Sequence, residues 1–67
     1  GYKALILEFL ATLPDDKAGV TCTEIIKSVA EFEGFSTQKI SPLVRQLMAA
    51  DKVTKTEVKG KALFRLA

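Results

Sequence analysis

The chain contains no histidine and only one cysteine, Cys22, among its 67 residues. One cysteine cannot form an internal disulfide, which favours a reducing compartment, and zinc sites built from cysteine and histidine are excluded for a single chain. Histidine is the commonest general base, so no imidazole is present to activate Cys22 as a nucleophile. The chain also lacks a glycine-rich phosphate loop and a recognisable pair of catalytic carboxylates. We therefore expect no enzymatic activity, no metal site and no cofactor.

Long hydrophobic runs are also missing, since the longest extends only from Ala4 to Leu7. A membrane span needs about 20 apolar residues. The chain does not begin with a charged segment followed by a long apolar core, so we expect no signal peptide. Hydrophobic residues still make up 48% of the chain, which is enough for a packed core and argues against disorder. We expect a single domain over residues 1–67 and no contact with a membrane. The origin of this domain in a longer protein is left open.

A first helix is predicted over residues 2–13, where apolar residues recur every three or four positions. This stripe consists of Tyr2, Leu5, Ile6, Phe9, Leu10 and Leu13. The turn signal Pro14-Asp15-Asp16 follows it. Leu7 lies off the stripe, so it is either tolerated at the surface or contacts a neighbouring domain or a dimer partner.

A second helix is predicted over residues 22–33. The segment Thr21-Cys22-Thr23-Glu24 matches a capping box, in which the side chains of Thr21 and Glu24 each accept a hydrogen bond from the other's amide. Val20 and Ile25 on either side of the cap can form a hydrophobic staple. Gly34 suits the left-handed position that ends a helix.

A third helix is predicted over residues 37–50, because Ser36 is a good N-cap just after Gly34. Its apolar stripe consists of Ile40, Leu43, Val44, Leu47 and Met48. Pro42 allows two interpretations: the helix continues through it with a slight bend, or Ser41 caps a helix that begins at Pro42. We favour the longer helix because Ile40 continues the stripe. A short junction with a glycine between two helices is typical of a helix-turn-helix.

The end of the chain predicts a β-hairpin near residues 53–66. Residues 52–58 are rich in valine and threonine, residues 61–66 follow, and Lys59-Gly60 can form a two-residue turn between them. Pairing about this turn places Val53 opposite Leu66 and Lys55 opposite Phe64. The apolar members of these pairs then share one face, which can cover the helices.

Positive charge is concentrated in the second half of the chain. Residues 35–67 carry seven lysines and arginines against two acidic residues, a net +5, whereas residues 1–34 carry three against six, a net −3. The overall charge of +2 conceals this difference. A one-sided basic field attracts polyanions, and duplex DNA is a polyanion that a helix and a two-stranded ribbon can fit.

The order of these elements is that of the winged helix-turn-helix, which is mainly α with a small β-hairpin. Residues 40–53, which read ISPLVRQLMAADKV, resemble the recognition helix and first wing strand of MarR-type and related bacterial transcriptional regulators. Residues 21–26 resemble the start of their second helix. The resemblance implies a DNA-binding module in transcriptional regulation or nucleoid organisation, located in the cytoplasm or on the nucleoid.

Two departures from the family pattern limit what the resemblance implies. Asp51 stands where a glycine is usual, so the turn after the third helix must tolerate a side chain. The long flanking helices through which MarR-type proteins dimerise and bind ligands are also missing. The resemblance therefore implies a DNA-binding module rather than a complete ligand-responsive repressor.

The exposed start of the third helix supplies the candidates for base contacts, because this part of a helix-turn-helix enters the major groove. Gln38 and Arg45 are seven positions apart and share one helical face. Glutamine can read adenine, and arginine can read guanine, through two hydrogen bonds each. Hydroxyl groups and lysines around them suit phosphate oxygens, and Lys59 and Lys61 flank the hairpin tip. The complete set of expected DNA contacts is Ser36, Thr37, Gln38, Lys39, Ser41, Arg45, Gln46, Lys55, Lys59, Lys61 and Arg65.

An interaction module of a larger protein assembly is the alternative function. The acidic surface of the first two helices, or Leu7, would then dock a partner protein. The uneven charge distribution favours DNA, while the modest overall charge of +2 leaves the alternative open.

Overall fold

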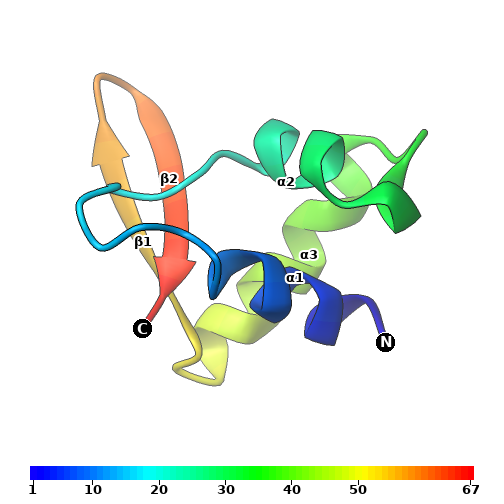
Figure 1. Ribbon diagram of the computed structural model, residues 1–67, viewed down its shortest axis with the longest axis horizontal. Coiled ribbons are helices and arrows are strands. Elements are labelled where there is room, and N and C mark those ends of the chain that lie inside the picture. The colour runs from blue at the N-terminus through cyan, green and yellow to red at the C-terminus, as the bar shows by residue number, and fades with distance from the viewer.

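The computed structural model describes residues 1–67 and contains three α-helices followed by an antiparallel β-hairpin (Figure 1). The elements are α1 (Tyr2–Leu10), α2 (Cys22–Ser28), the 3₁₀ helix η1 (Ala30–Phe32), α3 (Thr37–Ala49), β1 (Val53–Val58) and β2 (Lys61–Leu66). The hairpin stands at the left of the helices in Figure 1. The predicted layout of three helices and a small hairpin is confirmed. None of the helices is long and apolar enough to cross a membrane.

One hydrophobic core joins all three helices to the hairpin. Its ten buried residues are Ile6, Leu10, Val20, Ile25, Phe32, Ile40, Val44, Leu47, Val53 and Phe64. Ile6, Ile25 and Ile40 come from the three different helices, and each has 0% of its surface exposed. Because Val53 and Phe64 belong to the hairpin, the hairpin closes one side of the helical core.

The start of α2 forms as its sequence predicts. The Thr21 hydroxyl accepts a hydrogen bond from the Glu24 amide at 3.2 Å, and Glu24 Oε1 accepts one from the Thr21 amide at 3.5 Å. Val20 and Ile25 flank this cap, and both are buried in the core. Local hydrogen bonding and long-range burial therefore favour the same starting residue.

The end of α1 corrects the predicted span, because the helix stops at Leu10 rather than at Leu13. The amides of Thr12 and Leu13 donate to carbonyls only three residues back, at 3.0 and 3.2 Å, and the Thr12 hydroxyl donates to the Phe9 carbonyl. The last turn is therefore tightened. Pro14 disfavours a helical conformation for the residue before it, so the helix cannot continue.

The end of α2 is also earlier than predicted, at Ser28 rather than at Glu33. Val29 is extended, with φ −104° and ψ 115°, and the chain then forms η1. This break brings Phe32 into the core with 0% exposure and stacks it on Phe35 at 5.5 Å between ring centroids. Burial of a large aromatic side chain is worth about 1.5–3 kcal/mol, which exceeds the weak helical preference of a few residues.

The structure adopts the longer of the two alternatives for the third helix. Ser36 is the N-cap of α3, although its hydroxyl makes no capping bond, and Pro42 lies inside the helix. The proline lacks the amide that would bond to the Gln38 carbonyl. Gln38 is exposed, so water can bind this carbonyl instead.

The turn after α3 accommodates a side chain in a left-handed conformation. Asp51 has φ 60°, its amide donates to the Met48 carbonyl at 3.0 Å, and the Lys52 amide donates to the Leu47 carbonyl at 2.9 Å. These bonds form a Schellman motif, in which glycine is the usual residue. Asp51 is therefore strained, and its carboxylate lies at the negative end of the helix dipole.

We expect Asp51→Gly to raise the free energy of unfolding by about 1 kcal/mol, because it relieves both effects. Asp51→Asn is the matched control, since it removes the charge and keeps a residue that tolerates this conformation. Urea unfolding measures both variants. A glycine variant no more stable than the asparagine variant would show that backbone strain contributes nothing.

The hairpin has the predicted register, with Val53 opposite Leu66 and Lys55 opposite Phe64. Lys59 and Gly60 both have positive φ, 52° and 80°, as the tight two-residue turn requires.

A third segment, which the sequence analysis did not predict, pairs with the other edge of β2. Val20, in the loop between α1 and α2, exchanges two backbone hydrogen bonds with Phe64, at 2.9 and 2.8 Å. This pairing holds the loop against the hairpin.

Candidate nucleic-acid interface

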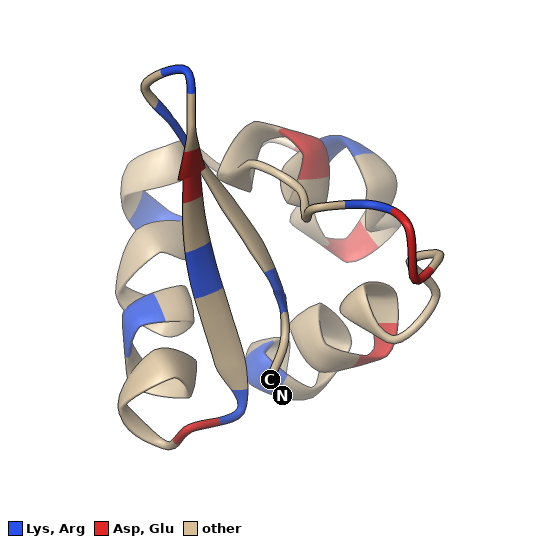
Figure 2. Ribbon diagram, turned by 90° about the vertical axis from the view of Figure 1, so that its left-hand side faces the viewer, with Lys and Arg blue, Asp and Glu red and all other residues tan.

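The two oppositely charged halves of the chain lie on different sides of the molecule. In Figure 2, α3 and the hairpin carry most of the Lys and Arg segments at the left and at the top. Most of the Asp and Glu segments lie to the right, in α1, α2 and η1 and in the loops that adjoin them. The charge difference along the sequence thus becomes a charge difference in space.

The exposed face of α3 presents Gln38 and Arg45. Both side chains are exposed, whereas Ile40 and Val44 of the same helix are buried against the core. Their spacing corresponds to about two turns, or about 10 Å along the helix. Neither side chain forms a hydrogen bond or an ion pair within the chain. Both are therefore available to an external ligand, and Gln46, also exposed, lies beside them.

The start of α3 suits an anion. Ser36 and Thr37 are exposed, and the Ser36 hydroxyl is free because it makes no capping bond. No acidic residue lies in the first turn, so the positive end of the helix dipole is not neutralised. The ammonium group of Lys39 lies 4.0 Å from the centre of the Phe35 ring, a cation–π contact that holds it close to this helix end.

Ser41, one helical turn after Thr37, is less exposed than these residues. It is half-buried, and its hydroxyl is 4.0 Å from the sulfur of Cys22 at the start of α2. Its side chain therefore lies at the edge of the face that carries Gln38 and Arg45, where α3 meets the start of α2.

The hairpin tip carries two free cations. Lys59 and Lys61 are exposed and form no ion pair. Lys55, further down β1, is different, because its ammonium group lies 3.5 Å from the Glu57 carboxylate on the same face of the strand. The positive charge of Lys55 is thus partly offset, and the tip is the strongest basic part of the hairpin.

Arg65 is occupied by the fold. Its guanidinium donates to the backbone carbonyls of Asp15, at 3.3 Å, and Lys17, and the side chain is half-buried. It therefore fastens the loop between α1 and α2 to β2. A DNA contact from Arg65 stays a prediction, but this side chain is not grouped with the tip.

An aromatic cluster beside the start of α3 was not recognised from the sequence. The Tyr2 ring meets Phe32 and Phe35 edge-on, at 5.8 and 5.4 Å, and Tyr2 remains 46% exposed. The spacing of Phe32 and Phe35 was a weak signal for this cluster, but the contact with Tyr2 depends on the tertiary fold. Within the cluster, Tyr2 and Phe32 pack against Phe35, whose ring contacts the ammonium group of Lys39.

The fold and the surface together define a class: a small three-helix domain with a β-hairpin and one basic face. The structure contains no group of three or more histidine, cysteine, aspartate or glutamate residues that could hold a metal ion. Comparisons with protein-family models, with curated proteins and with solved structures found no match.

Proposed function

We propose that this chain is a winged helix-turn-helix domain that binds duplex DNA, with α3 in the major groove and the hairpin tip against the backbone or the minor groove. The observation that carries the proposal is the pair Gln38 and Arg45, exposed and unpaired on one face of α3. The free lysines of the tip extend the basic side on which this helix lies. Regulation of transcription or organisation of the nucleoid is the expected role in a bacterial cell.

The dimensions of the molecule support this mode of binding. An α-helix with its side chains is about 10–12 Å across, which matches the width of about 12 Å of the major groove. The molecule measures 27 × 24 × 20 Å, so its longest dimension is shorter than one DNA turn of about 34 Å. One copy therefore contacts one major-groove segment and the phosphates that border it.

The hairpin tip is expected to add affinity without sequence preference, because contacts to phosphates carry no base information. Changing both Lys59 and Lys61 to alanine should weaken binding to all duplexes alike. It should also reduce the salt dependence of the association constant by roughly one to two units of log–log slope. Fluorescence anisotropy with labelled duplexes at several salt concentrations measures both effects.

Lys3→Ala combined with Lys27→Ala is the matched control for this experiment. Both lysines are exposed, neither forms an ion pair, and the pair removes the same charge from the other half of the chain. The control should leave the salt slope nearly unchanged. An equal reduction in both variants would mean that overall charge, rather than the tip, determines affinity.

Docking to a protein assembly is the second candidate function, and the acidic side formed by α1 and α2 is the observation that favours it. Leu7 no longer contributes to this candidate, because it is half-buried and packs against the core. If the wild-type domain binds no duplex DNA at low salt, protein docking replaces DNA binding as the favoured function.

A further inference from the structure

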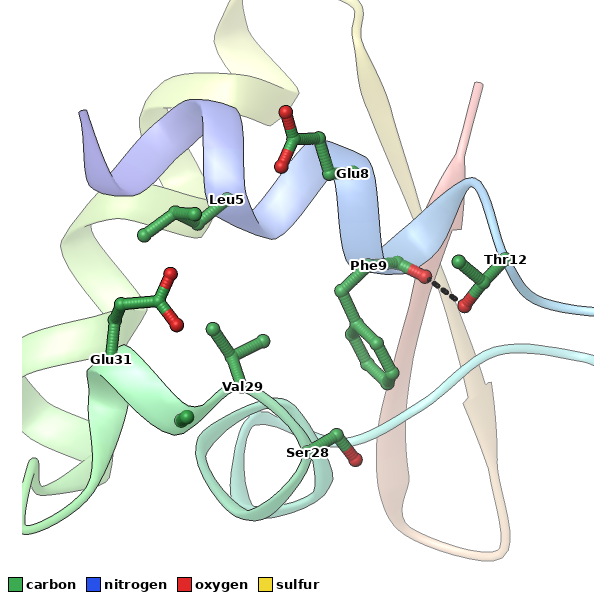
Figure 3. A pocket seen from close by; sticks show the side chains of 8 residues that line it. Leu5, Glu8, Phe9, Thr12, Ser28, Val29 and Glu31 are labelled. Carbon is green, nitrogen blue, oxygen red and sulfur yellow. Dashed lines mark hydrogen bonds between the residues drawn. The ribbon is translucent and has the colours of Figure 1, made fainter.

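A groove of about 320 Å³ lies between α1 and the segment that joins α2 to η1 (Figure 3). Its lining consists of Leu5, Glu8, Phe9, Thr12, Ser28, Val29, Ala30 and Glu31. All eight residues belong to the acidic half of the chain. None of them is among the expected DNA contacts.

The floor of the groove is apolar because α2 ends early. Val29 leaves the helix in an extended conformation, and its side chain projects with that of Phe9 into the gap between the two segments (Figure 3). Leu5, Phe9 and Val29 pack against the core but remain only half-buried. An occupant that covers them would remove further apolar surface from water, which favours binding.

The rim of the groove is negative. Glu8 comes from α1 and Glu31 from η1, both are exposed, and neither carboxylate forms an ion pair or a hydrogen bond. No lysine or arginine lines the groove. An occupant with positive charges on both sides of an apolar stripe is therefore complementary to it, whereas an acidic occupant is repelled.

We propose that this groove binds a basic amphipathic helix of a partner protein, with aliphatic side chains on the apolar floor and lysine or arginine beside Glu8 and Glu31. The lining residues on this side extend from Leu5 in α1 to Thr12 in the turn that follows the helix, about 10 Å. This length accepts anchors at positions i and i+4 of a partner helix. The inference is independent of the proposed DNA binding, because the two surfaces share no residue.

A synthetic alanine-based peptide of about 15 residues is a suitable probe, since shorter helices are marginal in water. It carries two leucines four residues apart, flanked by lysines, and two control peptides replace either the lysines by glutamate or the leucines by alanine. In a titration followed by amide chemical shifts, the lysine–leucine peptide should shift the residues of the groove. Both control peptides should bind at least several-fold more weakly.

Charge reversal tests the role of the rim. Glu8→Lys with Glu31→Lys should lower the affinity for the lysine–leucine peptide about tenfold or more at low ionic strength. The control, Asp15→Lys with Asp16→Lys, makes the same charge change in an exposed loop and should lose much less. Thermal unfolding verifies that both variants fold, and their DNA affinity should change by the same factor, because neither pair lies at the DNA surface.

Three results would overturn the inference. The first is equal binding of the lysine and glutamate peptides, and the second is no shift at the groove with the lysine–leucine peptide. The third is concentration-dependent self-association through Leu5, Phe9 and Val29, which would make a second copy of this chain the occupant. Failure to bind duplex DNA would contradict the proposed function and leave this inference standing.

Discussion

Replacing Gly19 with alanine should lower the free energy of unfolding by about 3 kcal/mol. Gly19 is buried and has φ 145°, a conformation that is rare for residues with a side chain. An added Cβ would lie 2.9 Å from both the amide nitrogen and the carbonyl oxygen of Phe64. The loop would have to move away from β2 and lose the two hydrogen bonds between Val20 and Phe64. Strain of about 1–3 kcal/mol and two lost bonds of about 0.5–1.5 kcal/mol each produce the expected effect.

Gly60→Ala is the matched control for this prediction. Gly60 also has positive φ, 80°, but an added Cβ would meet nothing within 4 Å. Only the backbone strain remains, so the expected loss is about 1 kcal/mol. A domain of this size is stable by roughly 3–10 kcal/mol, so urea unfolding separates the two variants clearly. Equal losses would contradict the view that the loop approaches β2 closely.

Replacing Arg45 with alanine should lower affinity for the preferred DNA site by about 5- to 150-fold more than for random duplex, which corresponds to about 1–3 kcal/mol. The reason is that arginine contacts guanine through two hydrogen bonds, and Arg45 is free to do so on the exposed face of α3. Thermal stability should not change, since the side chain has no partner within the fold. Gln38→Ala should act in the same direction at an adenine of the same site.

The test uses a preferred site selected from a pool of random duplexes, and it compares affinities for that site and for an unrelated duplex. Lys39→Ala is the control, because a phosphate contact should weaken binding to both DNAs by the same factor. If Arg45→Ala also loses the same factor on both, Arg45 contacts phosphate and its assignment to base recognition is wrong.

The starts of the elements were predictable because short-range chemistry determines them. Thr21 and Glu24 bond to each other's amides, and Lys59-Gly60 adopts the tight turn that sets the hairpin register. The end of α2 was not predictable in this way. The end of α2 depends on the burial of Phe32, and no pattern within the helix itself reveals that burial.

The residues of the candidate site also divide into those that local sequence predicts and those that tertiary contacts determine. Helical spacing alone predicted that Gln38 and Arg45 share an exposed face. Tertiary neighbours determine the remaining assignments: Ser41 faces Cys22, and Arg65 binds the loop carbonyls. No local feature of the sequence reveals these contacts, because their partners lie far away along the chain.

The most direct test of the central proposal is the affinity of the wild-type domain for duplex DNA as a function of salt concentration. If Lys39, Lys59 and Lys61 each neutralise one phosphate, the log–log slope of the association constant against salt should be near −3, since each contact contributes about −0.9. Fluorescence anisotropy of a labelled duplex should show tight binding at low salt and a steep decline as salt is added. No binding at the lowest salt concentration, or an affinity that does not depend on salt, would contradict the proposal that this domain binds DNA.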